Sequence, residues 1–160
     1  MTTPVIRPAH EHDVSRLIEL YAELDLHHRE AHPEFYAREY APREAAWVKE
    51  TLADPKAGIF VSESMPGEIS GLARILEVQT PVGRVHASRR FGLLDELVVA
   101  RSARRQGTAT ALLVACEAWA RGRGLSTIEV TVWAFNDAAR ELYENREFQV
   151  MRHYYRKQLG

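Results

Sequence analysis

One segment, from Leu94 to Ala109, constrains the fold more than any other part of the chain. It contains an apolar strand that ends near Val99, a basic turn, and a glycine, Gly107, that opens a helix. A glycine at this point lets the backbone pass close to a ligand. The first amides of the following helix have no partners within the helix, and they carry the positive end of its dipole. The segment therefore predicts a cradle for an anion such as a diphosphate.

Two sequence motifs, one in the cradle and one downstream of it, allow a comparison with known protein families. The cradle reads Arg104-Arg105-Gln106-Gly107-Thr108-Ala109, which fits the pattern Arg/Gln-x-x-Gly-x-Gly/Ala. Downstream, residues 136–144 read Asn-Asp-Ala-Ala-Arg-Glu-Leu-Tyr-Glu and are followed by Phe148. In this order and at this distance, the two motifs resemble those of the GNAT superfamily of N-acetyltransferases.

The resemblance implies an acetyl-CoA site. The cradle residues Arg104, Arg105, Gln106, Gly107, Thr108 and Ala109 would hold the pyrophosphate. In the family, two strands splay apart and pantetheine inserts between them like a strand. The matching positions are Leu97, Val98 and Val99, with the Leu97 amide meeting the thioester carbonyl. On composition alone, these three side chains belong to the core. Core packing and pantetheine binding are compatible, because the side chains pack while the backbone binds the ligand.

Other phosphate-binding loops do not fit the segment. A P-loop needs Gly-Lys-Ser/Thr, whereas Gly107-Thr108-Ala109 lacks the lysine. A Rossmann fingerprint needs two further glycines and an acidic residue that ends a following strand. We therefore set both alternatives aside.

Length and composition suit one globular domain over residues 1–160, because 46% of the residues are hydrophobic and 27% are charged. The 21 basic and 22 acidic residues give a formal charge of -1, so no global field recruits nucleic acid or an anionic membrane. The single cysteine, Cys116, excludes an internal disulfide, and we find no apolar signal or long apolar span. We expect a cytoplasmic protein.

Periodicity and turn residues divide the chain into elements. We expect strands over Val5–Pro8, Gly58–Glu63, Ile69–Val78, Phe91–Val99, Thr127–Trp133 and Gln149–Gln158. We expect helices from an N-cap at Asp13 to Leu24, over Arg43–Leu52, from Gly107 to Gly122, and from Asn136 through Tyr143. Two segments without a pattern, Asp25–Pro42 and Gln79–Arg90, are the expected walls of an acceptor site.

This order of elements predicts an α+β fold. Antiparallel hairpins come first, and strands then alternate with helices, which favours a mixed, mostly antiparallel central sheet with helices on both faces. The order matches the GNAT acyl-CoA N-acyltransferase fold over nearly the full length.

Asp95 and Glu96 lie inside the expected central strand, where a carboxylate costs free energy unless it is paired or used. Alternation puts Asp95 on the same face as Leu97 and Glu96 on the other, although a β-bulge would exchange them. We favour a catalytic role, and Asp95 over Glu96. Either residue could deprotonate an acceptor ammonium through a water or anchor it electrostatically.

Tyr143 matches the family tyrosine that lies near the cofactor sulfur and can protonate the thiolate; on its own it would be a half-buried helical aromatic. Asn136 could cap a helix, contact pantetheine, or do both. Glu147 departs from the family pattern, which has glycine before the phenylalanine. Because glycine there permits a left-handed turn, we expect Asn145 to adopt that conformation instead.

Metal chemistry is not indicated. His28 and His32 are four residues apart, as two ligands on one helical turn would be, but no third ligand with fitting spacing follows. We expect solvated or acceptor-pocket histidines and no metal. Cys116 lies on an apolar helix face and is expected to pack in the core.

These residues predict an acetyl-CoA-dependent N-acetyltransferase that acts directly on a primary amine, preferably of a small molecule. A protein N-terminal acetyltransferase and a non-catalytic acyl-CoA-binding sensor or partner module are the alternatives. The presence of Asp95 and Tyr143 argues against the sensor. The family resemblance also makes a homodimer plausible. The identity of the acceptor is not readable from the sequence.

Overall fold

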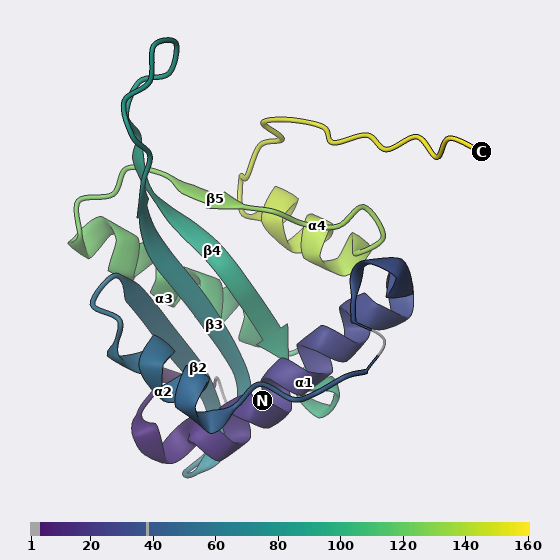
Figure 1. Ribbon diagram of the computed structural model, residues 1–160. Coiled ribbons are helices and arrows are strands. Elements are labelled where there is room, and N and C mark those ends of the chain that lie inside the picture. Colours follow the sequence, from purple (N-terminus) through teal and green to yellow (C-terminus); the bar gives the residue numbers. More distant parts are fainter. Residues whose placement is uncertain (1–3, 38) are drawn as a thin grey trace.

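The computed structural model describes residues 4–37 and 39–160 (Figure 1). One sheet has the strand order β1-β2-β3-β4-β5; neighbouring strands are antiparallel except for β4 and β5, which are parallel. Its strands are β1 (Val5–Pro8), β2 (Ala57–Met65), β3 (Glu68–Gln79), β4 (Arg90–Val99) and β5 (Ile128–Val130). The helices are α1 (Val14–Ala31), α2 (Ala45–Ala53), α3 (Thr108–Gly122) and α4 (Asp137–Asn145). The α+β prediction is confirmed.

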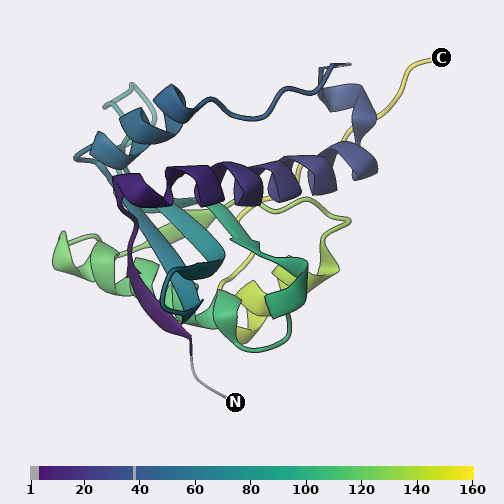
Figure 2. The same cartoon turned by 90° about the horizontal axis from the view of Figure 1, so that it is seen from below.

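Helices cover both faces of the sheet (Figure 2). On one face, α1 and α2 bury Leu17, Leu20 and Val48 together with Leu72 and Val98 of the sheet. On the other face, α3 and α4 contribute to a second cluster, whose buried members include Leu112, Leu113, Cys116 and Tyr143. The sheet therefore separates two apolar layers. Cys116 is fully buried, as expected.

Helix α1 is longer than the sequence pattern indicated. Residues 25–31 continue the helix, so the prediction of an irregular chain from Asp25 is wrong as far as Ala31. No glycine or proline interrupts this stretch before Pro33. The helix ends just before His32, which has φ -139° and ψ 64°. A proline disfavours the helical conformation of the residue before it, which accounts for the end point.

The N-terminus of α1 is held by an ion pair rather than by the expected side-chain cap. Asp13 occupies the N-cap position but makes no capping hydrogen bond to the helix. Its carboxylate accepts hydrogen bonds from the Arg7 guanidinium at 2.8 and 3.0 Å and from the His10 amide at 2.8 Å. The Arg7 hydrogen bonds are the main cause that lowers the pKa of Asp13. They also join β1 to α1.

The predicted terminal strand over Gln149–Gln158 is wrong. Residues 149–160, here called the tail, form no strand and are exposed throughout (Figure 1, yellow). A strand needs a neighbour for its backbone groups, and the described part of the chain pairs no strand with the tail. Arg156 contacts Glu34 at 3.5 Å and stacks on Phe35. The last packed residue before the tail is Phe148, whose ring centroid lies 5.4 Å from that of Tyr143.

No helix among the described residues is long and apolar enough to cross a membrane.

Candidate functional site

A β-bulge lies at Asp95 in the centre of β4. Glu96 pairs with Arg74 and Leu94 pairs with Ile75, which leaves Asp95 as an extra residue without a partner on β3. The bulge shifts the alternation by one residue, so Leu97 packs with the α3 and α4 cluster and Val98 with the α1 and α2 cluster. The bulge considered in the sequence analysis is therefore present.

Strands β4 and β5 part at the bulge. Their pairing covers Gly92 to Leu94 and ends at Val130, so the predicted strand over Thr127–Trp133 is shorter than expected. A bulge bends its strand and increases the local twist, which carries β4 away from β5. Among the described residues, positions 96–99 are paired on the β3 side alone, and Asp95 is paired on neither side. The predicted pantetheine-binding residues Leu97, Val98 and Val99 all lie in this stretch.

The predicted anion cradle leads from β4 into α3. A short 3-10 turn over Arg101–Ala103 follows β4, and Gly107 then precedes α3 with φ 79° and ψ 0°. Within the described part of the chain, and apart from the two neighbouring residues, no atom lies within 4 Å of the position that a Cβ of Gly107 would take. No side chain of the described residues caps the first amides of α3. The end of the helix is thus open to an anion, and the residues present fit a diphosphate.

The polar side chains of the cradle hold its shape. Arg104 donates to the Val99 carbonyl at 3.1 Å, and Gln106 donates to the Ser102 carbonyl at 3.3 Å. Thr108, which is buried, donates to the Ala103 carbonyl at 3.4 Å. Ala109 lies in the first turn of α3. Because these contacts turn the side chains toward the loop itself, the backbone amides are the groups available to a ligand.

Arg105 is the exception within the cradle. It is exposed, lies 3.8 Å from Glu141, and has a positive φ of 61°. A side chain in the left-handed region costs roughly 1–2 kcal/mol. Its side chain is 84% exposed.

Tyr143 lies on α4 and is 8% exposed. Burial raises the pKa of its hydroxyl to about 12. The phenol therefore keeps its proton at neutral pH and can donate it. Tyr143 belongs to the same cluster as Leu97 and Val99, on the α3 and α4 side of the sheet.

Asn136 caps α4, since its side-chain oxygen accepts a hydrogen bond from the Ala139 amide at 3.2 Å. The capping role is confirmed, and contact with pantetheine stays a prediction. After the helix, Glu147 itself has the left-handed conformation, with φ 64°. The expectation that Asn145 would take it is wrong, because Asn145 is the last residue of α4.

The two central carboxylates have different surroundings. The side chain of Asp95 is 34% exposed and accepts a hydrogen bond from Arg74 at 2.8 Å. The side chain of Glu96 is 10% exposed and pairs with Arg43, with Arg74 at 3.8 Å. Burial outweighs these arginines and raises the pKa of Glu96. Asp95 is thus the more accessible carboxylate beside the parted strands.

The sequence analysis missed the basic partners of these carboxylates. Arg74 lies inside the apolar strand β3, and an arginine in such a run is the same signal that singled out Asp95. Arg43 carries no comparable signal, because it precedes α2 in an otherwise polar segment. Both guanidiniums stack on the Trp47 ring, at 4.9 Å for Arg43 and 5.4 Å for Arg74.

The histidines of α1 join an aromatic cluster. The ring of His32 lies 4.7 Å from Trp133, and the rings of His27 and His28 lie 5.4 and 6.1 Å from Phe135.

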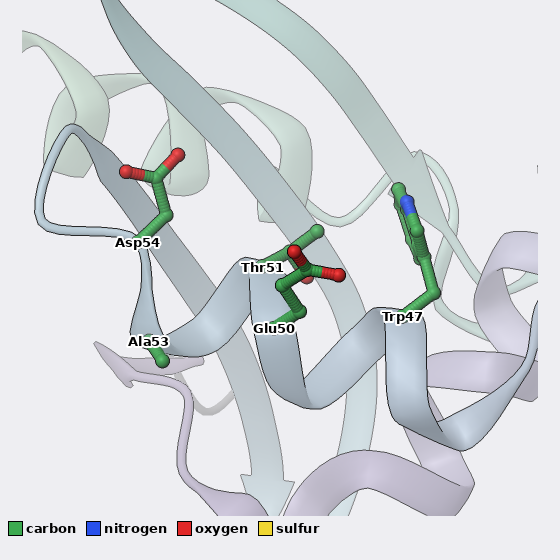
Figure 3. A pocket seen from close by; sticks show the side chains of 5 residues that line it. All are labelled: Trp47, Glu50, Thr51, Ala53 and Asp54. Atoms are coloured by element: carbon green, nitrogen blue, oxygen red, sulfur yellow. The ribbon is translucent and has the colours of Figure 1, made fainter.

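Across residues 4–37 and 39–160, no group of three or more metal-ligating side chains is found. A surface pocket lies along α2 (Figure 3), lined by Trp47, Glu50, Thr51, Ala53 and Asp54. None of the predicted site residues lines it.

The structure thus combines a stretch of β4 that has lost its pairing with β5 and a loop that leads from this stretch to the open N-terminus of α3. Residues 17–148 match the model of the acetyltransferase (GNAT) family. The chain belongs to this family and is an acetyl-CoA-dependent N-acetyltransferase.

The chain is similar to one curated protein and to several solved structures, the latter in fold. The aminoglycoside N(6')-acetyltransferase type 1 of Klebsiella aerogenes is 28% identical over 138 residues, which are 86% of this chain and 84% of that protein. A mutant of the BH1408 protein from Bacillus halodurans is 20% identical and superposes with a TM-score of 0.90 over 98% of this chain and 99% of that one. The aminoglycoside N-acetyltransferase AAC(6')-Iy in complex with CoA is 18% identical, with a TM-score of 0.72 over 97% and 100%.

Proposed function

We propose that the chain transfers the acetyl group of acetyl-CoA directly to a primary amine of a small molecule, without a covalent enzyme intermediate. The observation that carries this proposal is the break in strand pairing after Leu94, which leaves the backbone of residues 95–99 beside both the α3 N-terminus and an accessible carboxylate. The named activity of the Klebsiella relative, on aminoglycosides, supports a small-molecule acceptor.

Acetyl-CoA would bind through the cradle, with its diphosphate on the amides of residues 105–109 and its pantetheine along Leu97–Val99. A β-branched side chain at Gly107 would have to adopt φ 79° and would fill the space that the diphosphate needs. We expect Gly107→Val to weaken acetyl-CoA binding at least ~10-fold, or about 1.4 kcal/mol, by calorimetry. Unchanged affinity in a folded variant would contradict the assignment of the cradle.

The proposed chemistry assigns one task to each candidate residue. Asp95 receives a proton from the acceptor ammonium, directly or through a water, and the amine lone pair then forms the bond to the thioester carbonyl carbon. The Leu97 amide donates to the carbonyl oxygen as charge develops there. The carbon–sulfur bond breaks, and Tyr143 donates its proton to the departing thiolate. The surplus proton on the new amide nitrogen then passes through a water to the Tyr143 phenolate and restores the phenol. The position of Tyr143 supports this role, because its side chain lies in the same cluster as Leu97 and Val99.

Thiol release from acetyl-CoA across a panel of amines is the test. The panel should contain polyamines, aminoglycosides, amino acids and peptides with free N-termini. Release with small amines is the expected result. Release with peptides alone would identify a protein N-terminal acetyltransferase. Binding of acetyl-CoA without release in any assay would identify the non-catalytic sensor or partner module and would overturn the proposal.

We also propose that the protein works as a cytoplasmic homodimer. The exposed apolar side chains of the tail support self-association.

A further inference from the structure

A chain of ion pairs crosses the acceptor side of the site. Arg43 binds the Asp25 carboxylate through two hydrogen bonds, of 3.1 and 2.8 Å, and its other terminal nitrogen binds Glu96. Arg74 then joins Glu96 to Asp95. These five side chains, here called the Arg43 cluster, come from α1, β3, β4 and the segment before α2.

The guanidinium of Arg43 fills a cation site supplied by the fold. Besides its two carboxylates, it lies 4.3 Å from the ring centroid of Tyr21 and 4.9 Å from that of Trp47. Carboxylates and aromatic faces are the groups that bind organic cations. The Tyr21 hydroxyl and one Glu96 oxygen are also buried without a hydrogen-bond partner among the described residues. Arg43 thus occupies a position where a substrate ammonium would be well bound.

The net charge of the cluster balances one cation in addition to the two arginines. Two guanidiniums face three carboxylates, so one negative charge is uncompensated. His28 adds none at neutral pH, because burial lowers its pKa. Asp95 is the most exposed of the three carboxylates and has one arginine partner, so the excess charge is most accessible there.

We propose that Arg43 is a specificity-determining residue that restricts the acceptor subsite beside the thioester to one ammonium group; this inference rests on the proposed function. Arg43 neutralises the Asp25–Glu96 end of the cluster and leaves Asp95 to receive the reacting amine. Without Arg43, a substrate with two ammonium groups gains a second binding position.

The test measures binding of two probes by calorimetry with CoA present, n-butylamine and 1,4-diaminobutane. The measurement is made at pH 8.5, because burial raises the pKa of Glu96 and a higher pH favours its ionised form. In Arg43→Gln, we expect the preference for the diamine over the monoamine to rise at least about tenfold, since a second uncompensated carboxylate becomes available. Arg43→Lys keeps the charge and should keep the preference within about twofold of the wild type.

Two further variants separate charge from folding. The double variant Arg43→Gln with Asp25→Asn restores one excess negative charge and should return the preference to the wild-type value. Asp25→Asn alone removes the one excess negative charge of the wild-type cluster and should weaken binding of both probes about tenfold. This variant provides the test if Arg43→Gln fails to fold. The matched control is Arg121→Gln, which removes an arginine paired with Glu117 near the end of α3 and should change neither affinity.

An unchanged preference in a folded Arg43→Gln protein would overturn the inference, as would a wild type that binds neither probe. The measurement does not require turnover. A shifted preference in a protein that releases no thiol would therefore refute the proposed function while supporting the role of Arg43.

Discussion

At the residue scale, the bulge at Asp95 decides what each neighbouring side chain can do. It places Asp95 outside the regular alternation, whereas Glu96 points into the ion pairs with Arg43 and Arg74. Adjacent carboxylates thereby acquire different tasks. Asp95 remains accessible to a substrate, and Glu96 helps to fix the two arginines.

This difference gives a prediction for turnover. Asp95→Asn should lower kcat by roughly 10²-fold with little change in acetyl-CoA affinity, the size typical of lost acid-base help. Steady-state rates across pH, paired with calorimetry, check this result. If Asp95→Asn and Glu96→Gln both kept full rate at neutral pH, another group or solvent would have to deprotonate the amine.

Tyr143 permits a separation of chemistry from packing. Tyr143→Phe keeps the ring next to Phe148 and removes the hydroxyl alone. We expect kcat to fall on the order of 10- to 10³-fold, or about 1.4 to 4 kcal/mol, with unchanged melting temperature and acetyl-CoA affinity. Because the pKa of Tyr143 is about 12, its ionisation should not reduce the wild-type rate below pH ~10. Normal turnover with lost thermal stability would instead mean that the tyrosine is structural.

At the element scale, the end of α4 stores strain. Glu147 has φ 64° just before Phe148 returns to the core, and the Phe148 amide donates to the Tyr143 carbonyl at 3.0 Å. The left-handed conformation costs roughly 1–2 kcal/mol for a residue with a Cβ. Glycine removes this cost. Its unfolded chain has more conformational freedom, however, which lowers the stability of the folded protein by roughly 0.5–1 kcal/mol.

Glu147→Gly should therefore stabilise the protein by roughly 0.5–1 kcal/mol and raise Tm by about 1–4 °C. Thermal unfolding followed by circular dichroism measures the change. The matched control is Glu144→Gly, one turn earlier and within α4, which should lower stability by about 1 kcal/mol because helical glycine is unfavourable. A lower Tm for Glu147→Gly would show that the Glu147 side chain contributes more than its backbone costs.

At the scale of the whole molecule, the tail exposes an unusual amount of apolar surface. Its large exposed side chains are Val150, Met151, Tyr154, Tyr155 and Leu159. Burial of one such side chain contributes about 1.5–3 kcal/mol, so a second copy that covered the tail would be substantially stabilised. Strand β5 forms one edge of the sheet and offers backbone groups for such a contact.

Light scattering should accordingly give a wild-type mass of twice the 18.2 kDa of the chain. Removal of residues 149–160 should yield a monomer that keeps the sheet and the four helices. The control Val5→Ser changes an exposed apolar residue at the opposite edge of the sheet and should leave the dimer intact. A monomeric wild type, or a dimer that persists without the tail, would contradict this assignment.

The sequence by itself determined the elements whose signals are local. The glycine before α3, the Asn136 cap, the turn between β2 and β3, and the α+β order of elements follow from propensities and spacings within a few residues. The sequence also carried the two family motifs. Each of these features depends on neighbouring backbone groups, so a local pattern suffices to predict it.

Only the tertiary structure decided which side chains meet. The bulge arises from the pairing of β3 with β4, and the Arg43 cluster joins residues from four parts of the chain. The length of α1 and the unpaired tail were misjudged for the same reason. A helix continues until something stops it, and a strand forms only where another strand accepts its hydrogen bonds. Packing and pairing between distant segments settle these questions, and no local spacing encodes them.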